Sequence, residues 1–315
     1  MELAETKFNI PFMRYRHFFV GLSLVVIIAS VMAWFAAGKD KYGVDFLGGA
    51  EIVVRFDSPV AISSVREVLQ NAGISGAVVQ EFERGKNEFS VRTRAEQGED
   101  AVKQIRLALE QVGGGKITVL QQDYIGPTVG SEIRRSALIA LCIALVGILI
   151  YVSYRFEFNF AVAGILALAH DVIISAGVLV MFGYEVNSGV VAALLTIIGY
   201  SINDTIVIFD RIRENLYKAL KTGTVAKKSK NLKDLPAIID LSVNQTLSRT
   251  LLMSLTVFFV VVTLWLFGGG AVVELSFTLL VGVVVGTYST IFVASPIVVT
   301  LENISAKRAA VVQSS

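Results

Sequence analysis

Six long apolar segments constrain this 315-residue chain more than any other feature. Each is long enough to cross the hydrocarbon core of a bilayer as a helix, the simplest way to satisfy backbone groups there. With 54% hydrophobic residues, 17% charged residues and a mean hydropathy of +0.66, the chain is too apolar for an ordinary soluble protein. We therefore predict an α-helical polytopic membrane protein with six transmembrane helices. The predicted spans cover residues 17–37, 136–154, 160–182, 188–209, 247–267 and 275–301.

The first apolar segment has a second interpretation, a secretory signal peptide, because Lys7, Arg14 and Arg16 precede it. Signal peptides have a shorter apolar region of about 7–15 residues, and the stretch WFAAGKD is a poor cleavage site. We therefore expect residues 1–37 to form a cytoplasmic N-terminus and an uncleaved first helix.

The charges between the spans predict the orientation of the chain. The predicted outside turns contain Glu185 and Glu274 but no Lys or Arg, whereas the loop 210–249 contains nine basic residues. Short loops rich in Lys and Arg stay in the cytoplasm. We therefore expect a five-helix transmembrane domain at 135–304 with a basic cytoplasmic loop, followed by a cytoplasmic tail at 305–315.

Residues 38–134 differ from the rest of the chain, since they are charged and contain no spanning segment. Their alternating and helical patterns predict the order β-α-β-β-α-β, the ferredoxin-like arrangement. The pair Ser58-Pro59 supplies an N-cap and a first-turn proline for the first helix, which ends near Gly73. Because a single span precedes it, we expect this domain to be extracytoplasmic, or periplasmic. The other predicted elements are strands at 51–57, 77–83, 88–92 and 116–122 and a second helix at 99–112.

A carboxylate inside a predicted span is the strongest functional signal in the sequence. Asp204 lies in the fourth span, where a charged side chain costs roughly 2.5–3.5 kcal/mol on insertion scales. It shares a polar stripe with Thr196, Tyr200 and, approximately, Asn203. We predict a proton-linked role for Asp204, and packing against a neighbouring helix is the alternative.

Two further ionisable positions lie in or near the spans. Asp171 is near the middle of the third span, where His170 or a serine from another helix could satisfy it structurally, so function and packing are equally open. Arg249 opens the fifth span near the membrane edge, where a basic side chain can instead snorkel to the interface. Arg211 and Arg213 fit a topological role.

These groups suggest how protons could do work. Burial raises the pKa of an aspartate, and a nearby arginine lowers it. A carboxylate that alternates between pairing with Arg249 and facing a water wire would therefore bind and release a proton. Each proton carried inward is worth about 2.3 kcal/mol per 100 mV of membrane potential. That energy drives work only if the two protonation states favour different helix arrangements, for which small faces such as Gly282 and Gly286 leave room.

Enzymatic chemistry finds little support. Two aspartates on consecutive spans would suit an aspartyl intramembrane protease, but the stretches here are AHD and YSIND rather than YD and GxGD. The sequence has no HExxH, GxSxG or P-loop pattern, and its single cysteine, Cys142, lies in an apolar run. A net charge of +2 gives no general affinity for nucleic acid. We expect no catalytic residue, no metal and no cofactor, with protons as the coupling ion.

Several motifs together resemble the SecF family, whose members are subunits of the bacterial SecD–SecF export complex in the RND superfamily. They are YGVDFLGGAEI after the first span, GPTVGSEIRRSA before the second, AHDVIIS in the third, GYSINDTIVIFDRIREN in the fourth and NQTLSRT entering the fifth. The resemblance covers essentially the whole chain.

This resemblance implies a function in the bacterial inner membrane. A SecF subunit works with SecD and uses the proton-motive force to promote late-stage export of preproteins through the SecYEG channel, with YajC and YidC as further candidate partners. The resemblance implies that Asp204 and Arg249 carry the proton-linked role, and that Asp171 and His170 match a further motif. In the stretch DFLGG, the family motif falls on Asp45, Gly48 and Gly49, where glycines would permit a tight turn.

The chain departs from the family pattern at two places. A Lys-rich insertion occupies the loop 221–234, and Ser248 precedes Arg249 where some members have a histidine. Neither change affects Asp204 or Arg249. Two other functions stay open: a proton-coupled subunit of an RND-type small-molecule exporter, and a passive membrane-anchored scaffold whose outside domain binds a partner.

Overall fold

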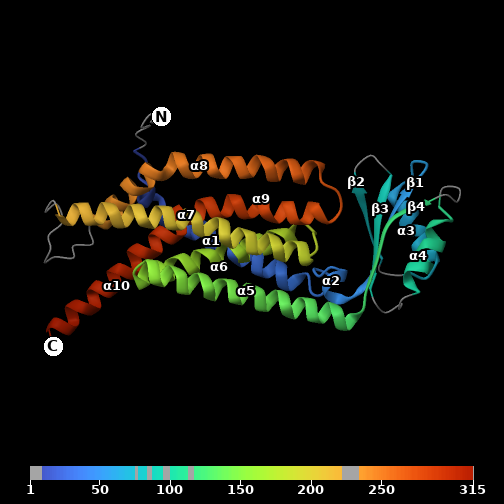
Figure 1. Ribbon diagram of the computed structural model, residues 1–315, viewed down its shortest axis with the longest axis horizontal. Helices are drawn as coiled ribbons and strands as arrows, with labels where there is room; N and C mark the ends of the chain where they lie inside the picture. Colours follow the sequence, from blue (N-terminus) through green and yellow to red (C-terminus); the bar gives the residue numbers. More distant parts are fainter. Residues whose placement is uncertain are drawn as a thin grey trace.

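Figure 1 shows a bundle of long helices with a small β-sheet at one of its ends. The computed structural model describes residues 9–74, 77–83, 87–94, 100–112, 117–221 and 234–314. Helix α1 (Arg16–Ala36) begins, and helix α10 (Ser295–Ser314) ends, at the end of the bundle away from the sheet (Figure 1).

Six helical segments of the described chain are long and apolar enough to cross a membrane, so the predicted number is confirmed. The last one is not a continuous α-helix. Its residues Thr290–Ala294 form a π-helical turn, η4, in which the backbone N–H of Ser295 donates to the carbonyl of Thr290, five residues earlier. The segments are the 3-10 turn η1 (Phe12–Tyr15) with α1, then α5 (Pro127–Arg155), α6 (Phe158–Met181), α7 (Ser188–Lys221), α8 (Leu235–Phe267), and α9 (Ala271–Ser289) with η4 and α10.

The ends of these helices differ from the predicted spans. Helix α5 begins at Pro127, nine residues before the predicted start, with the proline in its first turn. Helix α7 continues to Lys221 and α8 already begins at Leu235, so much of the predicted cytoplasmic loop 210–249 is helical, and its place in the cytoplasm stays a prediction. Hydropathy marks the part of a helix that lipid covers, whereas Glu, Lys and Arg continue a helix readily in water. The Lys-rich residues 222–233 lie outside the described residues.

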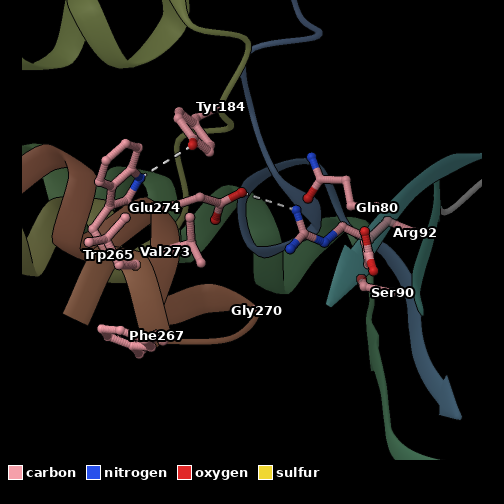
Figure 2. Close-up of a pocket in the computed structure, with 12 residues that line it drawn as sticks. Gln80, Ser90, Arg92, Tyr184, Trp265, Phe267, Gly270, Val273 and Glu274 are labelled. Atoms are coloured by element: carbon pink, nitrogen blue, oxygen red, sulfur yellow. Dashed lines mark hydrogen bonds and ion pairs between the residues drawn. The ribbon is translucent and has the colours of Figure 1, made fainter. Parts of the chain in front are cut away.

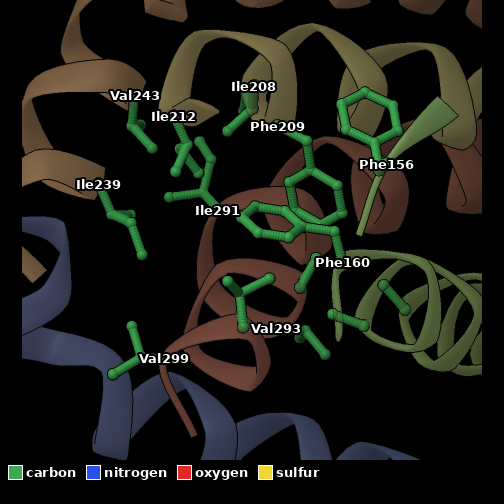
Figure 3. Packing of buried hydrophobic residues seen from close by; sticks show 14 of the residues in the cluster. Phe156, Phe160, Ile208, Phe209, Ile212, Ile239, Val243, Ile291, Val293 and Val299 are labelled. Carbon is green, nitrogen blue, oxygen red and sulfur yellow. The ribbon is translucent and has the colours of Figure 1, made fainter. Parts of the chain in front are cut away.

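Helix α9 lies at the centre of the bundle, packed against α6, α7 and α8, while α6 also packs against α1. Small residues allow this close approach, because a Cβ atom on Gly282 would overlap Ile197 of α7, and one on Gly177 would overlap Ser30 of α1. Helices α1 and α5 are the least buried and expose many apolar side chains. At the end opposite the sheet, an apolar cluster that includes Phe160 and Phe209 holds α6, α7, α8 and the η4–α10 segment together (Figure 3).

The sheet contains four strands in the order β2-β3-β1-β4, and each neighbouring pair is antiparallel. With the two longer helices of this region, the elements follow the predicted β-α-β-β-α-β order. Alternate residues of β1, such as Ile52 and Val54, pack with α3 and α4 into a core. The opposite face carries Glu51 and Arg92, which lie directly across from each other in register. The elements are α2 (Val44–Leu47), β1 (Gly49–Phe56), α3 (Ile62–Asn71), β2 (Val78–Glu83), β3 (Glu88–Arg94), α4 (Ala101–Leu109) and β4 (Ile117–Ile125).

One local prediction in this region is wrong. Helix α3 begins at Ile62 with Ala61 in the N-cap position, and Ser58 does not cap it. Strand β1 continues to Phe56, where it still pairs with Ile117, so residues 57–61 are needed to turn the chain back toward the helix. Residues 84–86, between the predicted strands at 77–83 and 88–92, and residues 113–116, after the predicted helix at 99–112, lie outside the described residues.

Candidate functional site

Buried polar side chains meet where α6, α7 and α9 pack together in the middle of the bundle. Asp171 of α6 is fully buried. Its Oδ1 lies 2.8 Å from Nδ1 of His170, and its Oδ2 accepts hydrogen bonds from Ser201 of α7 at 2.6 Å and Ser289 of α9 at 3.0 Å. This carboxylate therefore has a partner from each of three helices, which largely compensates its burial.

The same network continues toward α1. Nε2 of His170 lies 3.0 Å from the hydroxyl of Tyr288 on α9, which lies 3.0 Å from the hydroxyl of Ser23 on α1. Gly286 makes room for this arrangement, because a Cβ atom there would lie 3.6 Å from Oδ2 of Asp171 and 3.2 Å from the side chain of Ser201. We call the set Ser23, His170, Asp171, Ser201, Tyr288 and Ser289 the Asp171 network.

Asp204 of α7 has a different environment. Only 2% of its surface is exposed, and its Oδ2 has no hydrogen-bond partner among the described residues. The charge of Arg249 acts on this carboxylate, yet Arg249 is exposed and no ion pair joins the two in the described part of the chain. The ion pair proposed from the sequence is thus not formed in this arrangement. A buried, incompletely bonded carboxylate is costly, and in membrane helices it marks functional positions.

The face of α8 opposite Asp204 is also polar. The hydroxyl of Tyr200 donates to Ser254 at 3.0 Å, and Arg211 donates to Gln245 at 2.7 Å. Because α7 and α8 run antiparallel between these two contacts, Asp204 lies at about the level of Thr250. The hydroxyl of Thr250 is buried and, like Oδ2 of Asp204, has no partner among the described residues.

Two residues of the predicted stripe do not join this buried region. Asn203 and Thr196 are exposed, and the hydroxyl of Thr196 donates to the carbonyl of Ala192 in its own helix at 2.8 Å. Of the four supporting residues predicted, the structure places Tyr200 beside α8 and His170 in the Asp171 network. Their roles stay predictions.

The DFLGG stretch ties the beginning of the sheet to the helix bundle. Oδ2 of Asp45 accepts from the backbone N–H of Ser188 at 2.9 Å and from the Ser188 hydroxyl at the start of α7. Gly48 has a φ of 78°, and a Cβ atom there would lie 2.9 Å from the backbone of Pro127. Gly49 approaches the carbonyl of Thr93 so closely that a Cβ atom would overlap it. Glycine is therefore required at both positions.

A charged cluster between the sheet and the bundle was not among the predicted sites. Arg92 of β3 forms ion pairs with Glu51 at 3.0 Å, with Glu185 at 3.1 Å and with Glu274 at 3.3 Å. Burial alone would lower the pKa of Arg92, but the carboxylates of Glu274, Glu51 and Glu185 raise it above its ordinary value. Arg92 therefore keeps its charge at any physiological pH. In the sequence, Glu185 and Glu274 had served only to predict the orientation of the chain in the membrane.

A cavity of about 290 Å³ lies beside this cluster (Figure 2). Strands β2 and β3 contribute Gln80 and Ser90, and the end of α8 contributes Trp265, whose Nε1 donates to the hydroxyl of Tyr184 at 3.4 Å. The cavity separates part of the sheet from the bundle, so the charged cluster and the DFLGG stretch hold the two together. Within the described residues, no group of three His, Cys, Asp or Glu side chains is arranged to hold a metal ion.

Comparison with known protein families agrees with this architecture. Residues 41–60, which include the DFLGG stretch, match the SecD/SecF GG motif, and residues 104–304 match the family described as protein export membrane protein SecD/SecF, C-terminal. This chain belongs to the SecD/SecF family. The resemblance stated from the motifs is thereby confirmed.

Relatives within the SecD/SecF family match nearly the whole chain. The protein translocase subunit SecF of Calditerrivibrio nitroreducens is 41% identical over 96% of this chain and 98% of its own length. That of Desulfurispirillum indicum is 39% identical over 93% and 91%. The crystal structure of SecDF from Thermus thermophilus matches with a TM-score of 0.80 and 36% identity over 96% of this chain. The chain spans 40% of that SecDF chain.

Proposed function

We propose that this chain is an accessory subunit of the Sec translocase that uses the proton-motive force, together with a SecD partner, to promote late-stage export of preproteins through SecYEG. The buried Asp204 with its unpartnered oxygen supports this proposal most directly. A carboxylate that has a full set of partners gains little from a proton. One that lacks partners is stabilised when a proton neutralises it.

The arrangement of α7 and α8 provides two states for such a site. The deprotonated Asp204 carboxylate attracts Arg249 of α8, whereas the protonated acid does not, so proton binding changes the interaction between the two helices. Because α9 packs against both, a shift of α7 against α8 also changes the packing of α9. A proton gradient can drive this cycle because the two protonation states favour different helix arrangements.

The proposal includes a partner and an orientation. We propose SecD as the partner, because the SecDF relatives join the region that matches this chain to a second, longer portion. The apolar surfaces of α1, α5 and α8 are available to that partner and to lipid. The basic residues near the α7–α8 connection favour an orientation with both termini in the cytoplasm and the sheet outside the bacterial inner membrane. The subunit performs no covalent chemistry, and the proton is its coupling ion.

The test is preprotein export into inverted membrane vesicles that contain SecYEG, SecD and either this chain or its Asp204→Asn variant. We expect the variant to lose the stimulation of late-stage export by the proton gradient, since asparagine cannot take up a proton. Asp210→Asn is a matched control, because Asp210 lies on the same helix but is half exposed and pairs with Arg213 at 2.8 Å. Stimulation of the Asp204→Asn vesicles equal to that of the control would refute the proposal and favour a passive scaffold.

A further inference from the structure

The outer ends of α7 and α9, two helices that carry or contact the intramembrane aspartates, both contact one side chain of the sheet, Arg92. Helix α7 carries Asp204 and the Ser201 partner of Asp171, and α9 carries Ser289. Their outer ends lie beside Glu185, which precedes α7, and Glu274, in the first turn of α9. Both carboxylates bind Arg92 of β3, and a dashed line in Figure 2 marks the contact with Glu274.

The two contacts share one atom. Nη1 of Arg92 donates to Glu185 at 3.1 Å and to Glu274 at 3.3 Å, while Nε of the same side chain donates to Glu51 of the neighbouring strand at 3.0 Å. The side chains of Arg92 and Glu274 are only 8% and 3% exposed. Removing one partner of a buried ion pair leaves an uncompensated charge, so these groups resist separation.

The outer ends of α7 and α9 are attached to the sheet in different ways. The start of α7 is also held by main-chain contacts, since Val186 donates to the carbonyl of Lys41 at 2.7 Å and accepts from Gly43 at 3.1 Å. Asp45 adds its contact with Ser188. Between the described residues, no backbone hydrogen bond joins α9 to the sheet. Helix α9 is instead attached through the side chain of Glu274, which pairs with Arg92 of the sheet and also accepts a hydrogen bond from Asn187, just before α7.

We propose that Arg92 is the coupling residue that passes a displacement of α9 against α7 to the sheet. This inference rests on the proposed proton-driven function. Since Glu185 and Glu274 bind the same nitrogen, they cannot move apart without one of them releasing Arg92 or the strand moving with it. Through Nε and Glu51, the movement reaches β1 and the rest of the sheet.

The experiment combines Arg92→Gln with the vesicle export assay in two backgrounds, the wild-type chain and Asp204→Asn. Arg55→Gln is the matched control, because Arg55 lies in the same sheet and donates to Glu88 of β3 at 2.8 Å without reaching the bundle. We expect Arg92→Gln to lose gradient-stimulated export, Arg55→Gln to keep it, and Arg92→Gln to cause no further loss in the Asp204→Asn background. A merely structural defect would instead lower the remaining export in both backgrounds.

The outcomes separate the two proposals. If the proton gradient stimulates export in Asp204→Asn as strongly as in the wild-type chain, the proposed function is overturned, and this inference with it. Stimulation that persists in Arg92→Gln, or an additional loss in the double variant, would overturn only the coupling role.

Two further variants keep the test decisive if Arg92→Gln does not accumulate in the membrane. Glu274→Gln leaves Arg92 paired with Glu51 and Glu185, and we expect it to lose the stimulation as well. Arg92→Lys keeps the positive charge, but lysine has a single side-chain nitrogen in place of the Nε and Nη1 that bind the three carboxylates. We therefore expect gradient-stimulated export between that of Arg92→Gln and that of the wild-type chain. Wild-type stimulation in Glu274→Gln would contradict the coupling role.

Discussion

Asp171 and Asp204 are both buried in membrane helices, yet their surroundings are opposite. Asp171 has hydrogen-bond partners on both oxygens, from residues of α6, α7 and α9. Asp204 has one oxygen with no partner among the described residues and an arginine whose charge acts on it without a direct pair. Burial alone therefore does not distinguish a packing carboxylate from one that can change state; the number of donors around it does.

The comparison assigns different costs to the loss of each carboxylate. Removing Asp171 takes away the buried partner of His170 and Ser201, and Ser289 keeps only the carbonyl of Gly286 as an acceptor. Removing Asp204 leaves no hydrogen-bonding group newly unpaired among the described residues. The following predictions test this difference in detergent-solubilised protein.

The largest expected effect is that of Asp171→Ala. Each buried group left unsatisfied costs about 1–3 kcal/mol, so the loss of several partners is expected to destabilise the bundle by about 3 kcal/mol or more. Thermal unfolding followed by circular dichroism measures the change, with Asp204→Ala as the control that should unfold close to the wild-type temperature. An equal fall in Tm for both variants would remove the distinction between the two aspartates.

A smaller effect is expected for Ser289→Ala. Oδ2 of Asp171 then keeps its hydrogen bond from Ser201, and the loss of one hydrogen bond is worth about 1 kcal/mol. Ser276→Ala on the same helix is a suitable control, since Ser276 is buried but donates only to carbonyls of its own helix. If the Tm of Ser289→Ala is not lower than that of this control, the hydroxyl of Ser289 contributes no stability through the Asp171 network.

The smallest effect is expected for Thr250→Val. The change removes a buried hydroxyl without a partner among the described residues and keeps the shape of the side chain, so stability should change by less than about 0.5 kcal/mol. The same unfolding measurement checks this. A loss comparable to that of Ser289→Ala would mean that Thr250 has a partner beside Asp204.

The sequence was sufficient for the spans and for the order of the sheet elements. Runs of apolar residues identify lipid-facing helices directly, and the strand-like pattern of residues 51–57 predicted most of the strand Gly49–Phe56. The ends of α5 and α7 were not predictable from hydropathy, because helices continue beyond lipid as well as within it. Ser58 illustrates a similar limit, since its capping role depended on where β1 ends.

Less of the candidate site than of the fold could be predicted from the sequence. Asp171 and Asp204 both stood out as charges within apolar segments, but Ser201 and Ser289, which bind Asp171, come from other helices far away in sequence. Arg92 looked like an ordinary strand residue. The only signal was indirect: two outside turns each contained an acid, Glu185 and Glu274, with no basic residue nearby in sequence to pair with it.

The π turn at Thr290–Ala294 has a consequence for reading related sequences. An α-helix advances 100° per residue, so a turn that accommodates one extra residue changes the angular phase between the parts of the helix on either side of it. Ser289 faces Asp171 on one side of the turn, while Val298 and Val299 join the apolar cluster on the other. A helical wheel drawn continuously through this segment would assign one of these faces to the wrong neighbour. Phase should therefore be counted separately on each side of Thr290.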